Sequence, residues 1–218
     1  MNDWVGYFQN TKTYRNIYNQ CIGNRRLLEL IIKNTPNGGR ILELGCGTAL
    51  LSLILADYGF RVKALDLSKE ILDYAAGRMY LKDINLDFCQ GNILNLDTQF
   101  QADYFDTICH SGVMEHFSDE DIINSLSSQA KIAQIVIFRV PSIKNKITCK
   151  HFGDERFLSN KKWLELINAS GFRKASVYGD FDLPKAIYLF SPHILLVSRK
   201  LSFWFKWFSK HSIFVCEK

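Results

Sequence analysis

Two glycines and an acid between positions 45 and 66 have the residue types and spacing to bind a nucleoside-containing ligand. Gly45 and Gly47 would let a ligand approach the backbone, because glycine has no side chain and adopts left-handed backbone angles at little cost. Asp66 follows an apolar run, where its carboxylate can hold two ribose hydroxyls. Free N–H groups at the start of the helix after the glycines would add a polar surface.

These residues need a strand, a turn, a helix and a second strand to bring them together. Ile41 to Leu44 is a short apolar run typical of a buried parallel strand, and Thr48 to Tyr58 reads as an apolar helix. Gly59 ends this helix, and Arg61 to Leu65 forms the second strand. The segment is therefore one βαβ unit that carries Asp66 at its far end.

The dinucleotide-binding fingerprint G-x-G-x-x-G/A does not fit this turn. Gly45 and Gly47 occupy its first two positions, but Leu50 stands at the third. Leucine is too large there for close helix–strand packing beside a diphosphate. A nicotinamide cofactor is therefore disfavoured.

The turn instead resembles the first motif of class I S-adenosylmethionine-dependent methyltransferases, E-x-G-x-G followed by a small residue. Glu43, Gly45, Gly47 and Ala49 occupy these positions, although the family more often has glycine at the last one. The resemblance implies that the glycines face the methionine part of S-adenosylmethionine. It also implies that Asp66 binds the ribose and that Glu43 orients the turn and the amino group.

Two later segments extend the resemblance. Gln90 to Ile93 follows a predicted third strand, and the family commonly has an aspartate where Asn92 stands, in contact with the adenine amino group. The Asn92 side-chain carbonyl can accept the same hydrogen bond, and Ile93 would pack on the adenine. Tyr104 to Cys109 reads as a fourth strand, followed by a match to S-x-x-x-E-H. The cofactor-binding residues implied are Glu43, Gly45, Cys46, Gly47, Asp66, Leu67, Asn92, Ile93, His110 and Ser111.

The resemblance implies in-line methyl transfer from S-adenosylmethionine, with S-adenosylhomocysteine as the product. His116 is the candidate general base, the alternative being that its imidazole packs at a helix start. Arg139 could bind an anionic substrate group or an internal carboxylate. His151 and Arg156 lie in a long connection over residues 141–158 that would overhang the pocket, and they are further candidates for substrate contact.

The chain as a whole is predicted to be a single α/β domain over residues 1–218. The expected fold is a Rossmann-like seven-stranded sheet, mostly parallel, with helices on both faces; the resemblance implies an antiparallel last strand between the fifth and sixth. Residues 1–35 are predicted as an N-terminal helical lid. The six cysteines show no metal-ligand spacing and there is no secretory leader, so we expect no metal site and a cytoplasmic location.

The net charge of +5 is concentrated at the C-terminal end. We predict a basic, aromatic helical cap over residues 184–211, inserted before the last strand. Three interpretations of residues 193–210 remain open: a cap over the substrate pocket, a peripheral membrane contact, or a dimer surface. No nucleic-acid partner is expected, because the charge is too small for a phosphate-tracking surface. The cations of this end are Lys185, Arg199, Lys200, Lys206, Lys210 and Lys218.

The methyl acceptor is not specified by the sequence. The E-H pair and the long connection after the fifth predicted strand are most similar to small-molecule methyltransferases, so the acceptor atom could be O, N or C. Lipid-like, quinone and other natural-product intermediates are the acceptor classes considered. The alternative is a non-catalytic regulator or assembly factor that binds S-adenosylmethionine without turnover. The oligomeric state is left open.

Overall fold

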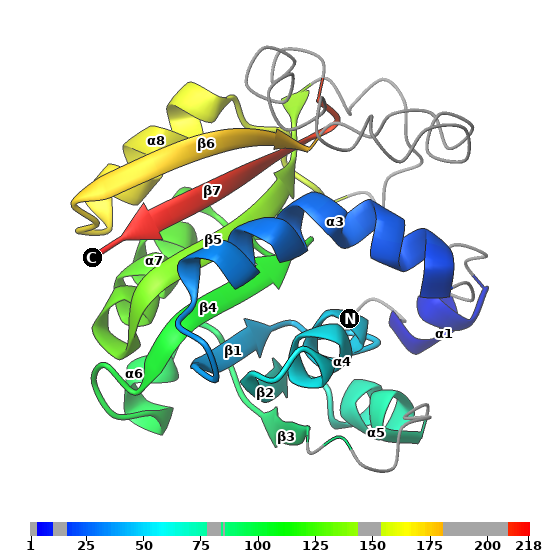
Figure 1. Ribbon diagram of the computed structural model, residues 1–218. Helices are drawn as coiled ribbons and strands as arrows, with labels where there is room; N and C mark the ends of the chain where they lie inside the picture. The colour runs from blue at the N-terminus through cyan, green and yellow to red at the C-terminus, as the bar shows by residue number, and fades with distance from the viewer. Residues whose placement is uncertain (1–3, 11–16, 78–83, 85, 144–153, 181–208) are drawn as a thin grey trace, which may run out of the picture.

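A seven-stranded sheet forms the centre of the protein in a computed structural model that describes residues 4–10, 17–77, 84, 86–143, 154–180 and 209–218. The strand order is β3-β2-β1-β4-β5-β7-β6 (Figure 1). In the described part of the chain, β7 runs antiparallel to both β5 and β6, and all the other neighbouring pairs are parallel. The strands are β1 (Arg40–Leu44), β2 (Arg61–Asp66), β3 (Asp87–Gln90), β4 (Phe105–Ser111), β5 (Ala133–Pro141), β6 (Lys174–Asp180) and β7 (His211–Glu217).

Helices cover both faces of the sheet, which confirms the predicted fold class. One apolar cluster joins the sheet to α6, α7 and α8, and a second joins it to α3 and α4. Figure 1 shows α3 crossing in front of the sheet and α7 and α8 behind it. The helices are α1 (Trp4–Asn10), α3 (Ile17–Asn34), α4 (Leu50–Asp57), α5 (Lys69–Gly77), α6 (Leu96–Gln99), α7 (Asp119–Ile132) and α8 (Asn160–Ala169), with a 3₁₀ turn η1 (Met114–His116).

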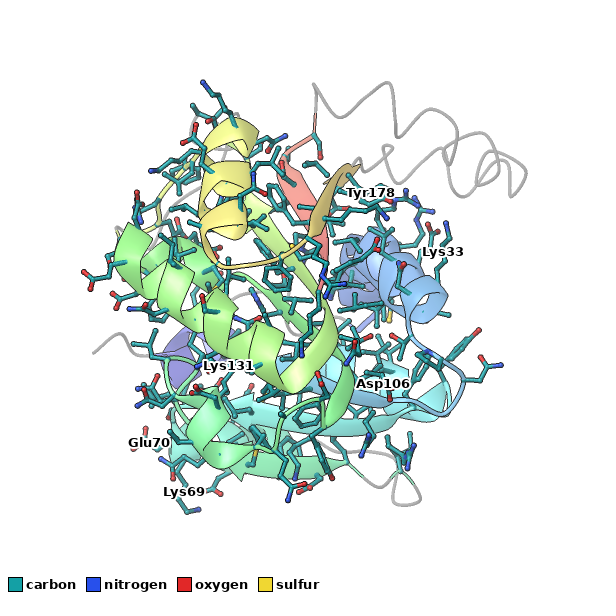
Figure 2. The ribbon with its side chains drawn as sticks, turned by 90° about the vertical axis from the view of Figure 1, so that its left-hand side faces the viewer. Lys33, Lys69, Glu70, Asp106, Lys131 and Tyr178 are labelled. Atoms are coloured by element: carbon teal, nitrogen blue, oxygen red, sulfur yellow. The ribbon has the colours of Figure 1, made fainter. Side chains whose placement is uncertain are left out.

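The largest fully buried side chains come from the strands of the sheet and from the apolar stripes of the helices. Trp163 of α8 and Phe138 of β5 are completely buried and meet edge to face, with ring centroids 5.7 Å apart. The exposed lysines Lys33, Lys69 and Lys131 lie on the outside of α3, α5 and α7 (Figure 2). The amphipathic pattern therefore determines which face of each helix meets the sheet.

Two helix starts show how local chemistry sets the boundaries. Ser118 is the residue before the first turn of α7, and its hydroxyl accepts the Asp121 N–H at 3.1 Å. The helix after the glycine turn begins at Leu50, two residues later than predicted. Ala49 has a φ of 53°, in the left-handed region, so the turn continues through it before helical geometry begins.

Several predicted segments lie outside the described residues. They include most of the basic cap at 184–211 and His151. Within the described part, no helix is long and apolar enough to span a membrane.

Candidate active site

The predicted cofactor residues converge on one cavity of about 760 Å³ at the carboxyl ends of the parallel strands. The loops that follow β1, β2, β3 and β4 contribute to its wall, and the end of β5, α1 and the start of β7 also line it. Ligand sites in open α/β sheets occupy this edge. Every predicted cofactor residue except His110 lines the cavity: Glu43, Gly45, Cys46, Gly47, Asp66, Leu67, Asn92, Ile93 and Ser111.

The glycine turn leaves no room for side chains at its two glycines. Gly45 has a φ of 60° and Gly47 a φ of 53°, angles that other residues adopt only with strain. A Cβ at Gly45 would lie 2.7 Å from a methyl carbon of Val113, and one at Gly47 would lie 2.7 Å from the Phe8 ring. The turn is therefore packed between the β4 loop and α1, with its backbone at the cavity wall.

Asp66 is held in a fixed orientation at the end of β2. Its two carboxylate oxygens accept the backbone N–H groups of Gly47, at 3.2 Å, and of Ser68, at 3.1 Å. Burial raises the pKa of Asp66, and these backbone hydrogen bonds oppose the rise. The carboxylate thus connects the glycine turn to β2 and lies at the cavity wall, where the resemblance places a ribose-binding acid.

Glu43, in β1, connects the strand before the glycine turn to the helix after it. It is buried, and one carboxylate oxygen accepts both the backbone N–H, at 2.9 Å, and the hydroxyl of Ser52 in α4. Burial raises the pKa of Glu43 to about 7, and its hydrogen bonds from Ser52 limit the rise. This arrangement fixes α4 against β1 and directs its first turn toward the cavity.

Asn92 and Ile93 follow β3 and form the neighbouring wall. The Asn92 side-chain oxygen accepts the Leu94 N–H at 3.0 Å. A carbonyl oxygen has two lone pairs, so a second hydrogen bond from a ligand is still available. Ile93 is buried and lines the cavity beside it. The pair therefore offers a polar atom and an apolar surface, as an adenine ring requires.

His110 occupies the core instead of the cavity wall. Its ring is fully buried, stacks on Phe138 at 5.1 Å between centroids, and has no hydrogen-bonded nitrogen among the described residues. Burial lowers the pKa of His110 to about 3, so the ring is neutral near neutral pH. Successive side chains of a strand point to opposite faces of the sheet, so the side chain of Ser111, which lines the cavity, and that of His110 point in opposite directions.

His116 lies at the cavity beside an acid that the sequence did not single out as its partner. Its Nδ1 is 2.9 Å from a carboxylate oxygen of Asp154, and both residues line the cavity. A carboxylate at Nδ1 fixes the imidazole orientation and favours the tautomer with the proton on that nitrogen. The other ring nitrogen is then the one suited to accept a proton.

The two described arginines predicted to contact substrate have protein partners. Arg139 lines the cavity and donates to Asp180 at 3.0 Å, to the Gly23 carbonyl at 2.5 Å and to Ser111 at 2.9 Å. It thus has the internal carboxylate that the sequence allowed as an alternative. Arg156 does not line the cavity. It donates to the Phe117 carbonyl and to Asp119, so it binds residues 154–158 against the start of α7.

Tyr7, Phe8 and Glu115 are among the cavity residues that the sequence did not single out. Tyr7 and Phe8 come from α1, within the predicted lid of residues 1–35, but the sequence did not distinguish them from the other residues of that segment. Glu115 matches the S-x-x-x-E-H motif but was assigned no function. The available signal was an acid within the otherwise apolar run V-M-E-H-F, which indicates a buried carboxyl group.

The fold, the glycine turn and the oriented Asp66 together define the architecture of class I S-adenosylmethionine-dependent methyltransferases. Residues 41–134 match the family model described as "Methyltransferase domain". The same fold occurs in a SAM-dependent methyltransferase from Archaeoglobus fulgidus, with a TM-score of 0.71 and 14% identity over 97% of this chain and 99% of that one. The resemblance found in the sequence is thereby confirmed.

Relatives similar in sequence match only part of the chain. A ubiquinone biosynthesis O-methyltransferase from Xanthomonas axonopodis pv. citri is 32% identical over 88 residues, which are 40% of this chain and 36% of that protein. One of the same description from Coxiella burnetii is 34% identical over 87 residues, 39% of this chain and 36% of that protein. The chain spans less than half the length of the curated relatives it matches.

Proposed function

We propose that this protein transfers a methyl group from S-adenosylmethionine to a small-molecule acceptor. The observation that carries the proposal is the convergence of the glycine turn, Asp66 and Asn92 on one cavity, with the Asp66 carboxylate fixed by the Gly47 N–H. The residues fit the cofactor, because a side chain at either glycine would meet a neighbour and the wall provides an acid and an amide oxygen.

Each part of the cavity would have a distinct role. Asp66 would bind the ribose hydroxyls, Asn92 and Ile93 the adenine, and the glycine turn above Glu43 the methionine part. When bound, S-adenosylmethionine supplies an electrophilic methyl carbon attached to a sulfonium. The protein's task is then to orient the acceptor and to exclude water, which can contribute several kcal/mol to the rate enhancement, roughly 7–11 at the extreme.

His116 is proposed as the general base where the acceptor atom carries a proton. Its Nδ1 is oriented by Asp154, so its Nε2 is the nitrogen that would accept the acceptor's proton. General-base catalysis typically contributes about 10²–10⁴-fold in rate. Residues 1–35 are proposed to form a lid over the cavity, because Tyr7 and Phe8 of α1 line it.

Calorimetric titration tests the cofactor site directly. We expect micromolar binding of S-adenosylmethionine and S-adenosylhomocysteine, no binding of NADH, and at least tenfold weaker binding by Asp66→Ala. Asp57→Ala is the matched control, because it removes an exposed acid from the far end of α4. Failure of the folded, ligand-free protein to bind either adenosyl compound would refute the proposal. Binding without methyl transfer to any acceptor would favour the non-catalytic alternative.

A further inference from the structure

The part of the cavity beyond the cofactor residues is acidic. Glu115 and His116 line it from η1, and Asp154 and Glu155 line it from the segment that begins at residue 154. The backbone N–H of Arg156 donates to the Glu115 carbonyl at 2.9 Å, so the segment carrying Asp154 and Glu155 is attached to η1. These carboxyl groups are therefore held on one wall by the backbone itself.

Glu115 has a buried oxygen that no described residue satisfies. The residue is 4% exposed, and its Oε2 has no hydrogen-bond partner among the described residues, although the side chain lines the cavity. A buried polar atom without a partner destabilises the folded state, because it has lost its hydrogen bonds to water. Burial raises the pKa of Glu115 to about 8, and the nearby charges of Glu155 and Asp154 add to the rise. A donor on a bound ligand would remove this cost.

The cations near this wall are already engaged by protein groups. Arg139 pairs with Asp180, whose side chain is 4% exposed, and it also donates to the side chain of Asn24 at 2.7 Å. Burial, followed by the charge of Arg139, lowers the pKa of His211 to about 4, so this cavity residue is neutral near pH 7. An anionic acceptor would thus meet carboxyl groups without a cation free to compensate them in the described wall.

We propose that this wall is the acceptor site and that it selects a small molecule bearing a basic amine, whose N–H groups donate to Glu115. The proposal rests on the proposed function, because it assigns the substrate class of the same cavity. Phe117 and Phe157 also line the cavity, so an aryl group attached to the amine would find an apolar surface. The partner that Glu115 lacks is then the ligand's ammonium group, and a charge-assisted hydrogen bond is the strong kind.

A set of three probes that differ only in the head group tests this selection. Phenethylamine, 2-phenylethanol and 3-phenylpropanoate are titrated calorimetrically into protein saturated with S-adenosylhomocysteine at pH 7. We expect saturable binding of the amine and at least tenfold weaker binding of the alcohol and of the carboxylate. Amine binding should also release protons, measured in two buffers of different ionisation enthalpy, because the ammonium group favours the ionised Glu115 carboxyl.

The variants assign the effect to Glu115. Glu115→Gln should weaken amine binding at least tenfold and abolish proton release while S-adenosylhomocysteine still binds, and Glu120→Gln, on the exposed side of α7, should change neither. Equal binding of all three probes, tighter binding of the carboxylate, no binding of the amine, or an unchanged Glu115→Gln would each overturn the proposal. If Glu115→Gln does not fold, the relative affinities of the three probes for the wild-type protein, together with the proton release on amine binding, test the proposal. Failure of the proposed function would be seen separately, as absent S-adenosylhomocysteine binding.

Discussion

Glu43, His110 and Glu115 are all buried, but their surroundings differ. Glu43 is buried but receives hydrogen bonds from Ser52, so it acts as part of the scaffold under the glycine turn. His110 is buried in an aromatic stack and is neutral. Glu115 is buried at the cavity with one oxygen unsatisfied. Of these three residues, only Glu115 combines a place at the cavity wall with a buried oxygen that no described residue satisfies, which makes it the candidate ligand contact.

The titration of Glu115 should make the stability of the protein depend on pH. Its folded pKa of about 8 exceeds the ordinary 4.5, so between these values the native state keeps a proton that the unfolded chain releases. The free energy of unfolding should therefore fall as pH rises from about 5 to 8, by at most about 1.4 kcal/mol per pH unit from this group. Urea unfolding across this range measures the slope.

Glu115→Gln isolates this contribution, because glutamine has a similar shape and does not titrate. We expect a flatter dependence on pH for this variant, and a wild-type dependence for Glu120→Gln. His110 acts in the opposite direction below pH 6.5, but it is present in all three proteins and cancels in the comparison. Equal slopes in wild type and Glu115→Gln would contradict a buried, proton-retaining carboxyl group at this position.

Residue types predicted the glycine turn and Asp66 at the cavity wall better than the wall around His116. Gly45, Gly47 and Asp66 could be located because a turn and a strand end fix them relative to each other within one short segment. The contact between His116 and Asp154 joins residues whose separation in the sequence includes α7, β5 and a long connection. Such a contact depends on tertiary packing, and local pattern carries no information about it.

Arg139 of β5 is hydrogen-bonded to three other elements around the cavity, which are β4, through Ser111, β6 and α3. From β5 it reaches Asp180 at the end of β6, and it also reaches Gly23 and Asn24 in α3. Both side chains of the ion pair are shielded, with 16% exposure for Arg139 and 4% for Asp180. The position of α3 over the sheet therefore depends in part on one guanidinium, which explains a cation near the end of a buried strand.

Replacement of Arg139 should destabilise the protein strongly. Arg139→Met leaves the Asp180 carboxylate buried without its cation, and losing one partner of a buried pair costs about 3–5 kcal/mol. Lys174→Met is the matched control, since it breaks the ion pair of Lys174 with Glu217 between β6 and β7, where the two side chains are 63% and 43% exposed. An exposed pair contributes little to stability, because water and salt screen its charges. Urea unfolding measures both changes, and similar losses would contradict a special role for Arg139.

Element existence could be predicted more closely than element boundaries. Ser118 and Ser159 begin α7 and α8 as hydroxyl caps, since each hydroxyl accepts an N–H three residues later. The four-residue helix α6 was not predicted, because so short a segment has no apolar period to detect. The left-handed Ala49 delayed the start of α4, since alanine carries no sequence signal for a positive φ.

The order of the strands belongs to the whole molecule. Local sequence predicts each strand, but β7 enters between β5 and β6 and pairs with both through residues 211–217. That placement came from the family resemblance, not from the residues of β7 themselves. The core is accordingly built from long-range contacts, which also bring His211 at the start of β7 to the cavity wall.

Ligand binding at one edge of this sheet should be visible across the molecule by hydrogen exchange. Saturating S-adenosylhomocysteine is expected to slow exchange in the loops at the carboxyl ends of the strands, residues 45–48, 66–68 and 90–93, and in α1, because these segments line the cavity. At 100 times Kd the ligand also stabilises the native state by about 2.7 kcal/mol.

The opposite edge of the sheet provides the internal control. Residues 58–60 and 101–104 connect helices to the amino ends of β2 and β4, away from the cavity. Amides there that exchange by local opening should keep their rates, while amides that exchange only on global unfolding should slow by the common factor that the ligand's stabilisation sets. Equal slowing at both edges would mean that the ligand acts only through global stability. Slowing confined to residues 58–60 and 101–104 would place the ligand at the wrong end of the sheet.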